Sequence, residues 1–186
     1  MSANGNDAAL MDRVEAVVYD ADTIAERVRE LAAEVSAYYR TGELLLLGTL
    51  KGSFMFMADL VRHIERPHQL EFIVAASYGS GTTSSGHVRL VYDPEVGFSG
   101  RHVLVIEDIV ESGATLNRLV RLLETRDPES LEVCTLLHKR LTDDLVLEPR
   151  FVGFDAPREF LVGYGLDYAE DYRHLPYIGK LKASHG

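Results

Sequence analysis

The 186-residue chain has one cysteine, no long apolar run and many fewer basic than acidic side chains. Because Cys134 has no second cysteine to pair with, an intramolecular disulfide is excluded, which is compatible with a reducing cytoplasm. The longest apolar run, at 44–47, falls far short of the ~18 residues that cross a bilayer. We therefore expect a cytoplasmic protein in which Cys134 is a small buried hydrophobe.

The shortage of basic side chains limits the kinds of partner. The sequence has 29 acidic and 19 basic residues, a formal net charge of −10. Nonspecific binding to nucleic acids or to membrane surfaces depends on a basic face, so neither is expected. An anionic small ligand is still possible, since a few local cations and backbone N–H groups can hold phosphate in an acidic protein.

Two catalytic motifs are also missing. The seven histidines include no helix-spaced zinc pair, and the chain contains no G-x-x-x-x-G-K-[ST] loop. The sequence thus argues against a zinc hydrolase and against an NTPase of the P-loop type.

The organisation of the chain is that of one domain. The polar first residues contain no basic segment followed by an apolar one, so we expect no secretory signal there. We expect residues 1–10 to form a disordered tail. Residues 11–186 show no internal repeat and suit a single domain with one sizeable core.

Apolar runs alternate with helical patterns along the chain. Strands are predicted at 14–19, 44–47, 70–76, 88–92, 103–106, 131–137, 151–154 and 160–162, and helices at 23–39, 54–64 and 115–123. A capping box at 23–26 is expected to open the first helix. Strands separated by helices predict an α/β fold with a mainly parallel, twisted sheet flanked by helices. Ligands of such sheets bind beyond the carboxyl ends of the strands.

The most informative segment is 103–116. Four apolar residues form a strand, Glu107 and Asp108 end it, and a loop with Ser112, Gly113 and Thr115 leads into a helix. Successive N–H groups of such a loop, with a helix N-terminus behind them, form a cradle for an anion.

The acidic side chains beside this cradle need an explanation, because they would repel a bare phosphate. Glu107, Asp108 and Glu111 make sense if they face ribose hydroxyls, a divalent metal or a proton that has to be removed. The residues alone leave these three roles open.

Segment 103–116 resembles the phosphoribosyl-diphosphate signature of the type I phosphoribosyltransferases. Segments 50–56 (LKGSFMF) and 77–82 (SYGSGT) resemble that family's first diphosphate loop and its mobile catalytic loop. Segments 136–140, 151–154 and 160–168 are similar to further family motifs. Together, from about Thr23 to Ile178, they resemble the 6-oxopurine branch, the hypoxanthine-guanine phosphoribosyltransferases.

This resemblance implies the type I phosphoribosyltransferase fold, with a small hood formed by the terminal segments. It implies purine salvage, in which 5-phosphoribosyl 1-diphosphate and hypoxanthine or guanine give IMP or GMP and diphosphate. The implied cofactor is Mg²⁺, and the implied assembly is a homodimer or homotetramer. Residues 54–57 would serve either that interface or the helix core.

The resemblance also assigns roles to residues at the sugar and phosphates. Glu107 and Asp108 would bind the ribose hydroxyls, directly or through Mg²⁺, and Asp167 would ligate a second Mg²⁺. The 5′-phosphate would be held by the loop residues Ser112, Gly113, Ala114 and Thr115. The diphosphate would meet Lys51, Gly52 and Arg173, with a cis peptide between Leu50 and Lys51.

A second group would handle the base. By the same resemblance, Lys139 donates to the purine 6-oxo group, Phe160 stacks on the ring and Leu161 contacts it through its backbone. Ser77 and Tyr78 would close over the reacting centre and exclude water.

One position departs from the family pattern. Glu111 stands where the family has the aspartate proposed to take the proton from purine N7, and its extra methylene moves the carboxylate by roughly 1 Å. Glu111 then serves as the base after a small adjustment, or the pocket is altered, or catalysis is slow. We favour the first, and keep as alternatives a phosphoribosyl-diphosphate-binding regulator and an enzyme that prefers xanthine.

Overall fold

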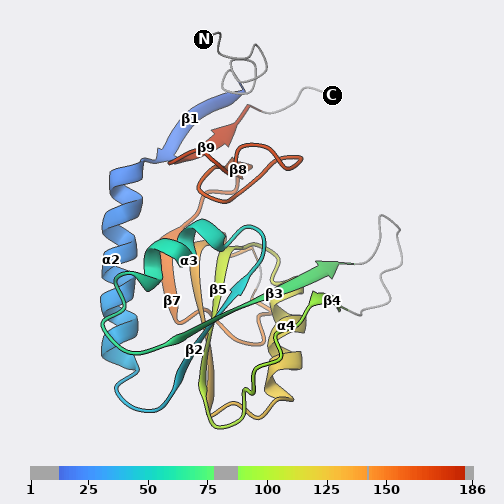
Figure 1. Ribbon diagram of the computed structural model, residues 1–186. Helices are drawn as coiled ribbons and strands as arrows, with labels where there is room; N and C mark the ends of the chain where they lie inside the picture. The colour runs from blue at the N-terminus through green and yellow to red at the C-terminus, as the bar shows by residue number, and fades with distance from the viewer. Residues whose placement is uncertain (1–12, 78–87, 142, 183–186) are drawn as a thin grey trace, which may run out of the picture.

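The computed structural model describes residues 13–77, 88–141 and 143–182 and shows a six-stranded central sheet (Figure 1). The strand order is β4-β3-β2-β5-β6-β7, and only the edge strand β4 is antiparallel to its neighbour. The strands are β2 Leu44–Thr49, β3 Gln69–Ser77, β4 Val88–Tyr92, β5 His102–Val110, β6 Ser130–His138 and β7 Phe151–Asp155. The predicted mainly parallel sheet is confirmed.

Helices cover both faces of this sheet. The helices α2 (Ala21–Tyr38) and α3 (Phe54–Val61) lie on one face and α4 (Ala114–Glu124) on the other (Figure 1). Successive strand side chains point to opposite faces. Leu44 and Leu46 therefore join the core under α2 and α3, while Leu45 and Leu47 join the core under α4. The continuous apolar run at 44–47 is explained by this double coverage.

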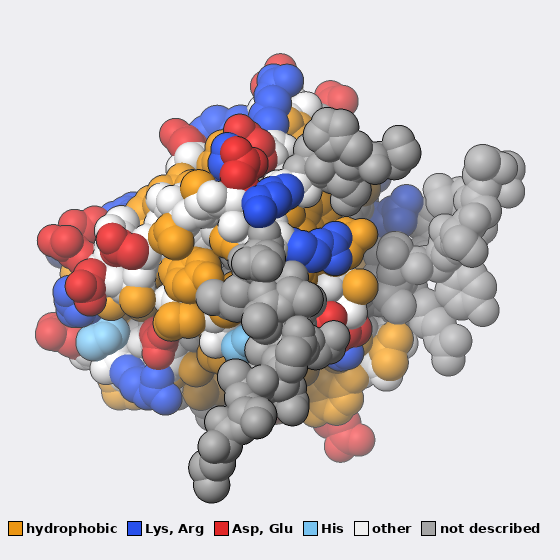
Figure 2. Space-filling model, turned by 90° about the horizontal axis from the view of Figure 1, so that it is seen from above, with side chains coloured by type: hydrophobic (Ala, Val, Ile, Leu, Met, Phe, Trp, Pro, Cys, Tyr) orange, Lys and Arg blue, Asp and Glu red, His pale blue; other side chains and the backbone are white. Residues whose placement is uncertain are grey.

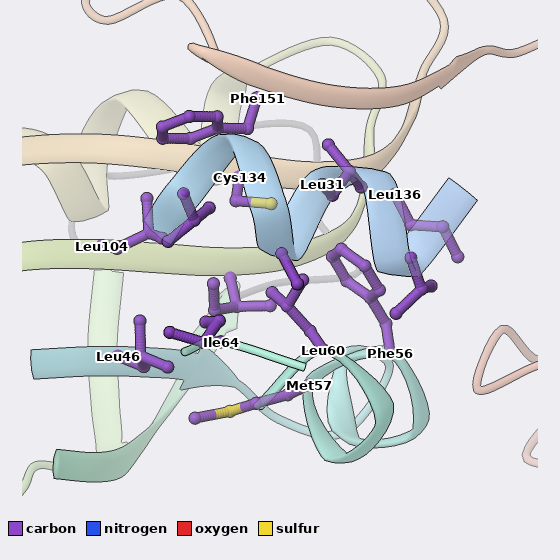
Figure 3. Packing of buried hydrophobic residues seen from close by; sticks show 14 of the residues in the cluster. Leu31, Leu46, Phe56, Met57, Leu60, Ile64, Leu104, Cys134, Leu136 and Phe151 are labelled. Carbon is purple, nitrogen blue, oxygen red and sulfur yellow. The ribbon is translucent and has the colours of Figure 1, made fainter. Parts of the chain in front are cut away.

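The larger core is built between α2, α3 and the sheet. Phe56, Met57 and Leu60 of α3 belong to one cluster with Leu31 of α2 and Cys134 of β6. Figure 3 shows Phe56 on the side of α3 that faces α2, and Met57 on the side of Leu46. Cys134 is fully buried, as expected for a small hydrophobe. Phe56 and Met57 belong to the helix core, whereas Phe54 and Met55 are half-buried.

A three-stranded antiparallel sheet forms the hood that the resemblance implies. Its strands are β1 (Val14–Tyr19), β8 (Leu161–Val162) and β9 (Ile178–Leu181), in the order β1-β9-β8. The hood lies beyond the end of the large sheet at which β2 passes into α3, that is, beyond the carboxyl ends of the parallel strands (Figure 1). Leu161, Tyr164 and Ile178 of the hood belong to the same hydrophobic cluster as Leu46.

Three predicted boundaries are wrong. The first helix is capped by Asp20, whose carboxylate accepts a hydrogen bond of 2.8 Å from the Thr23 N–H, so no capping box opens it at 23–26. Helix α3 ends at Val61 because Arg62 and His63 turn back tightly onto Asp59 and Leu60.

Strand β5 is longer than predicted. It continues to Val110, so Glu107 and Asp108 lie within the strand and do not end it. The extension follows from pairing, because β6 runs beside β5 as far as His138. The predicted tail at 1–10 falls outside the described residues. In the part of the chain that is described, no helix is long and apolar enough to cross a membrane.

Candidate active site

The phosphate cradle lies where β5 passes into α4. Gly113 adopts the left-handed conformation, with φ of 70°, directly before the first residue of α4. A glycine takes this conformation without steric cost, which lets the chain turn tightly into the helix. A cavity of about 270 Å³ is lined by Glu107 and by residues 109–116. The first N–H groups of α4 have no acceptor within the helix and lie along this cavity, which suits an anion.

Glu107 is buried and Asp108 half-buried beside the cradle. Burial and the neighbouring Asp108 raise the pKa of Glu107 to about 8. Burial raises the pKa of Asp108 to about 6, against the hydrogen bond from the Ile109 N–H and the charge of Arg173. The low polarity of the site therefore favours neutral carboxyl groups, or a ligand that supplies hydroxyl donors or a cation.

Thr49 from β2 links Glu107 to the strand backbone. Its hydroxyl oxygen lies 2.6 Å from Glu107 Oε2 and 3.0 Å from the Ile106 carbonyl oxygen. One hydroxyl proton serves only one acceptor at a time. A hydrogen bond from Thr49 to Glu107 lowers the pKa of Glu107, but burial and the charge of Asp108 outweigh it.

The loop after β2 closes on the same carboxylates. A Cβ at residue 52 would overlap the Asp108 carboxylate, so only glycine permits this approach. The Leu50–Lys51 peptide bond is cis, as the resemblance implies. A smaller cavity of about 110 Å³ lies here, lined by Thr49, Leu50, Gly52, Glu107, Asp108 and Thr115.

Lys139 and Glu111 form an ion pair at the rim of the cradle. Lys139 Nζ lies 2.5 Å from Glu111 Oε1, and the lysine side chain is only 5% exposed while that of Glu111 is 50% exposed. The two residues follow Val110 and His138, which are in register on β5 and β6. Glu111 lines the cavity, and the pair places the Lys139 donor directly beside this acceptor.

The predicted base platform lies in the hood. Phe160 is 52% exposed, and its ring meets the Tyr168 ring edge-on with 5.5 Å between centroids. The Arg13 guanidinium lies 5.0 Å from the centre of the Tyr168 ring. Leu161 is buried and paired with Lys180 in the hood sheet. The sequence analysis did not single out Arg13, and it included Tyr168 only as the last residue of segment 160–168, with no role of its own.

Asp167 and Arg173 pair with each other. Arg173 Nη2 lies 2.8 Å from Asp167 Oδ1, and Arg173 Nη1 donates to the Gly165 carbonyl oxygen at 2.7 Å. Glu170, which the sequence analysis did not single out, lies 2.9 Å from Lys51 Nζ. The hydrogen bond and charge of Lys51 lower the pKa of Glu170.

The carboxylates assigned to metal do not all meet. Among the described residues, no three Asp, Glu, His or Cys side chains converge on one point that could hold an ion. Glu107 and Asp108 are adjacent, whereas Asp167 is engaged by Arg173 and by the Glu170 N–H. Ser77 ends β3, and Tyr78 lies outside the described residues, so their predicted roles stay predictions.

Comparison with known proteins identifies this arrangement. A family model described as a phosphoribosyl transferase domain matches residues 17–169, so the chain belongs to the phosphoribosyltransferases and has their fold.

Individual relatives match the chain over most of its length. The chain is 44% identical over 170 residues to the hypoxanthine phosphoribosyltransferase of Salmonella typhimurium, covering 90% of this chain and 95% of that one. It is 44% identical over 169 residues to the hypoxanthine-guanine phosphoribosyltransferase of Bacillus subtilis, covering 91% and 94%. A crystal structure of a Staphylococcus aureus hypoxanthine phosphoribosyltransferase superimposes with a TM-score of 0.88 at 39% identity, covering 97% of both chains. The chain belongs to the hypoxanthine phosphoribosyltransferase family.

Proposed function

We propose that this protein is a purine-salvage enzyme that transfers the phosphoribosyl group of 5-phosphoribosyl 1-diphosphate to hypoxanthine or guanine. The observation that carries the proposal is the Lys139–Glu111 pair beside the anion cradle. A 6-oxopurine presents an acceptor at O6 next to N7–H, which matches a lysine donor beside a carboxylate acceptor. A 6-amino group has no lone pair to accept from Lys139, so adenine fits poorly.

The reaction is a substitution at the anomeric carbon. The C1′–oxygen bond to diphosphate breaks, the C1′–N9 bond forms, and the N7 proton passes to Glu111. Ser112, Gly113, Ala114 and Thr115 hold the 5′-phosphate through backbone N–H groups and hydroxyls. Phe160 stacks on the base and Leu161 contacts it through its backbone, so the hood fixes the purine over the sugar.

Glu107 and Asp108 act on the ribose. As carboxylates they accept hydrogen bonds from the ribose hydroxyls and stabilise the positive charge that develops on the sugar ring. Lys51, Gly52 and Arg173 receive the leaving diphosphate. Ser77 and Tyr78 close over the centre.

Mg²⁺ is the proposed cofactor, and the residues fit it. Glu107 is buried and the neighbouring Asp108 half-buried, and a cation would stabilise the charged forms of both carboxyl groups. Mg²⁺ is usually bound by one or two carboxylates together with substrate phosphates, which agrees with the separate position of Asp167. When bound, the ion neutralises charge on the diphosphate and so makes it a better leaving group.

We further propose a cytoplasmic homodimer or homotetramer acting on small-molecule substrates. The half-buried Phe54 and Met55 of α3 offer apolar area for a subunit contact. The relatives, which are named for hypoxanthine or for hypoxanthine and guanine, do not favour the regulator or the xanthine-preferring alternative.

The test is product formation with phosphoribosyl diphosphate, Mg²⁺ and each of hypoxanthine, guanine, xanthine, adenine and uracil. Wild type should turn over hypoxanthine or guanine. Glu111→Asp should stay within about tenfold of wild type, whereas Glu111→Gln, which cannot take the proton, should lose at least about 100-fold in kcat. Wild type that binds phosphoribosyl diphosphate but turns over no base, with activity restored by Glu111→Asp, would contradict the proposal.

A further inference from the structure

One carboxylate joins the two cations assigned to the diphosphate. Glu170 Oε2 lies 2.9 Å from Lys51 Nζ and 3.5 Å from Arg173 Nη2. Lys51 belongs to the loop after β2, whereas Arg173 lies in the segment between β8 and β9. Glu170 therefore ties the hood to the diphosphate loop of the large sheet through one negatively charged group.

The backbone that carries this carboxylate has an unusual conformation. Ala169 and Glu170 have positive φ angles of 53° and 69°, which residues other than glycine rarely adopt. The turn is held by two mutual backbone hydrogen bonds between Tyr168 and Asp171 and by the Glu170 N–H bond to Asp167. The surrounding bonds thus maintain a conformation that glutamate does not favour by itself, and such conformations often mark functional positions.

The two cations lie next to the carboxylates assigned to the ribose. Gly52, the neighbour of Lys51, abuts the Asp108 side chain, and the charge of Arg173 acts on Asp108. In the proposed reaction the diphosphate leaves from this side of the sugar. Glu170 therefore forms ion pairs with the same two cations that would bind the diphosphate group.

We propose that Glu170 is a positioning residue that stands in for diphosphate in the ligand-free enzyme. Its carboxylate holds Lys51 and Arg173 until the diphosphate of the substrate displaces it, and it takes them back when product diphosphate leaves. The inference rests on the proposed function for the identity of the anion. Arg173 keeps its contacts to Asp167 and Gly165 during the exchange, so the cation remains in place while Glu170 moves away.

Replacing Glu170 by diphosphate at the two cations should lower the affinity for diphosphate by a measurable amount. Each diphosphate that binds must break the Glu170 pairs, which weakens binding and speeds release. Both Lys51 and Glu170 are about two-thirds exposed, so the effect is modest. Removing the charge at residue 170 should tighten diphosphate binding by about threefold to tenfold.

The experiment compares Glu170→Gln with wild type, using Glu124→Gln on α4 as a charge-matched control. Titration calorimetry with inorganic diphosphate and Mg²⁺ should show tighter binding for Glu170→Gln only. KM for phosphoribosyl diphosphate should fall by a similar factor and kcat should fall as product release slows, while KM for hypoxanthine stays constant. If Glu170 merely supports the loop, the variant binds diphosphate more weakly, and that result, like an unchanged affinity, overturns the proposal.

The two proposals can fail separately. A wild type that turns over purine while the diphosphate constants of Glu170→Gln are unchanged overturns only the role of Glu170. A wild type that binds diphosphate but turns over no base overturns only the proposed function, and the binding comparison still decides the role of Glu170.

Discussion

Two consecutive acidic residues, the buried Glu107 and the half-buried Asp108, have carboxyl groups whose charged forms are disfavoured by burial. The Thr49 hydroxyl lies 2.6 Å from the Glu107 carboxyl group. Such a pair is a poor choice for stability alone, because an apolar residue would fill the same space without the cost of desolvation. We interpret the pair as a site built for a ligand.

The first prediction concerns the pH dependence of stability without metal or ligand. The folded pKa of Glu107, about 8, lies above its ordinary 4.5, so the folded state keeps a proton that the unfolded chain has lost. This stabilisation is complete below pH 4.5 and disappears as the pH rises through about 8. The free energy of unfolding in EDTA should therefore fall over this range, by on the order of a few kcal/mol.

Urea titrations at several pH values measure this slope. Glu107→Gln, which has no proton to lose, should flatten it, whereas the exposed Glu124→Gln should leave it unchanged. Equal slopes in wild type and Glu107→Gln would show that burial does not shift this group.

Only some site residues can be predicted from the sequence. Glu111 and Lys139 each come directly after a buried parallel strand. Because Val110 and His138 are partners in the register of β5 and β6, the residues that follow them lie close together. Arg13, Tyr168 and Glu170 lie in segments without periodicity. Their contacts depend on how the hood packs against the large sheet, and this packing cannot be predicted from the local sequence.

At the scale of single elements, α2 shows how one side chain sets a boundary. Asp20 accepts the Thr23 N–H, one of the donors that a helix start leaves without a partner. Asp20→Ala should lower Tm by about 2–4 °C, because that donor loses its acceptor. Thermal unfolding followed by circular dichroism measures the change. Asp22→Ala, in the same first turn, is the control, and an equal Tm loss there would rule out a capping role specific to Asp20.

The presence of elements is easier to predict than their ends. The run of leucines at 44–47 is a strand because both sheet faces are covered. Strand β5 continues past its apolar residues because β6 offers hydrogen bonds to its end, which the sequence of β5 does not reveal. Strand β9 escapes prediction because only four residues form it and its partner β1 is distant in sequence.

At the scale of the whole molecule, the hood and the large sheet share one core. Leu161, Tyr164 and Ile178 pack in the same cluster as Leu46, and the Tyr164 hydroxyl donates to Asp59 of α3 at 2.6 Å. Figure 2, a view onto the hood side, shows acidic and basic side chains interspersed with hydrophobic ones. Charge of a single sign does not collect on the visible part of this face.

The shared core predicts that residues 11–186 unfold as one domain. Calorimetry should show a single transition whose van't Hoff and calorimetric enthalpies agree. The near-ultraviolet signal of the tyrosines, several of which lie in the hood, should change together with the far-ultraviolet signal. A separate early loss of the tyrosine signal would show that the hood unfolds independently.

The pairing of β1 with β9 has a consequence for synthesis on the ribosome. The chain emerges from its N-terminal end, so β1 appears first, while its hydrogen-bonding neighbour β9 is made after all the other described strands. The phosphate cradle at the β5–α4 junction requires only the middle of the chain. The β5–α4 junction is therefore synthesised well before the hood sheet can be completed, and β1 stays without its neighbouring strand in between.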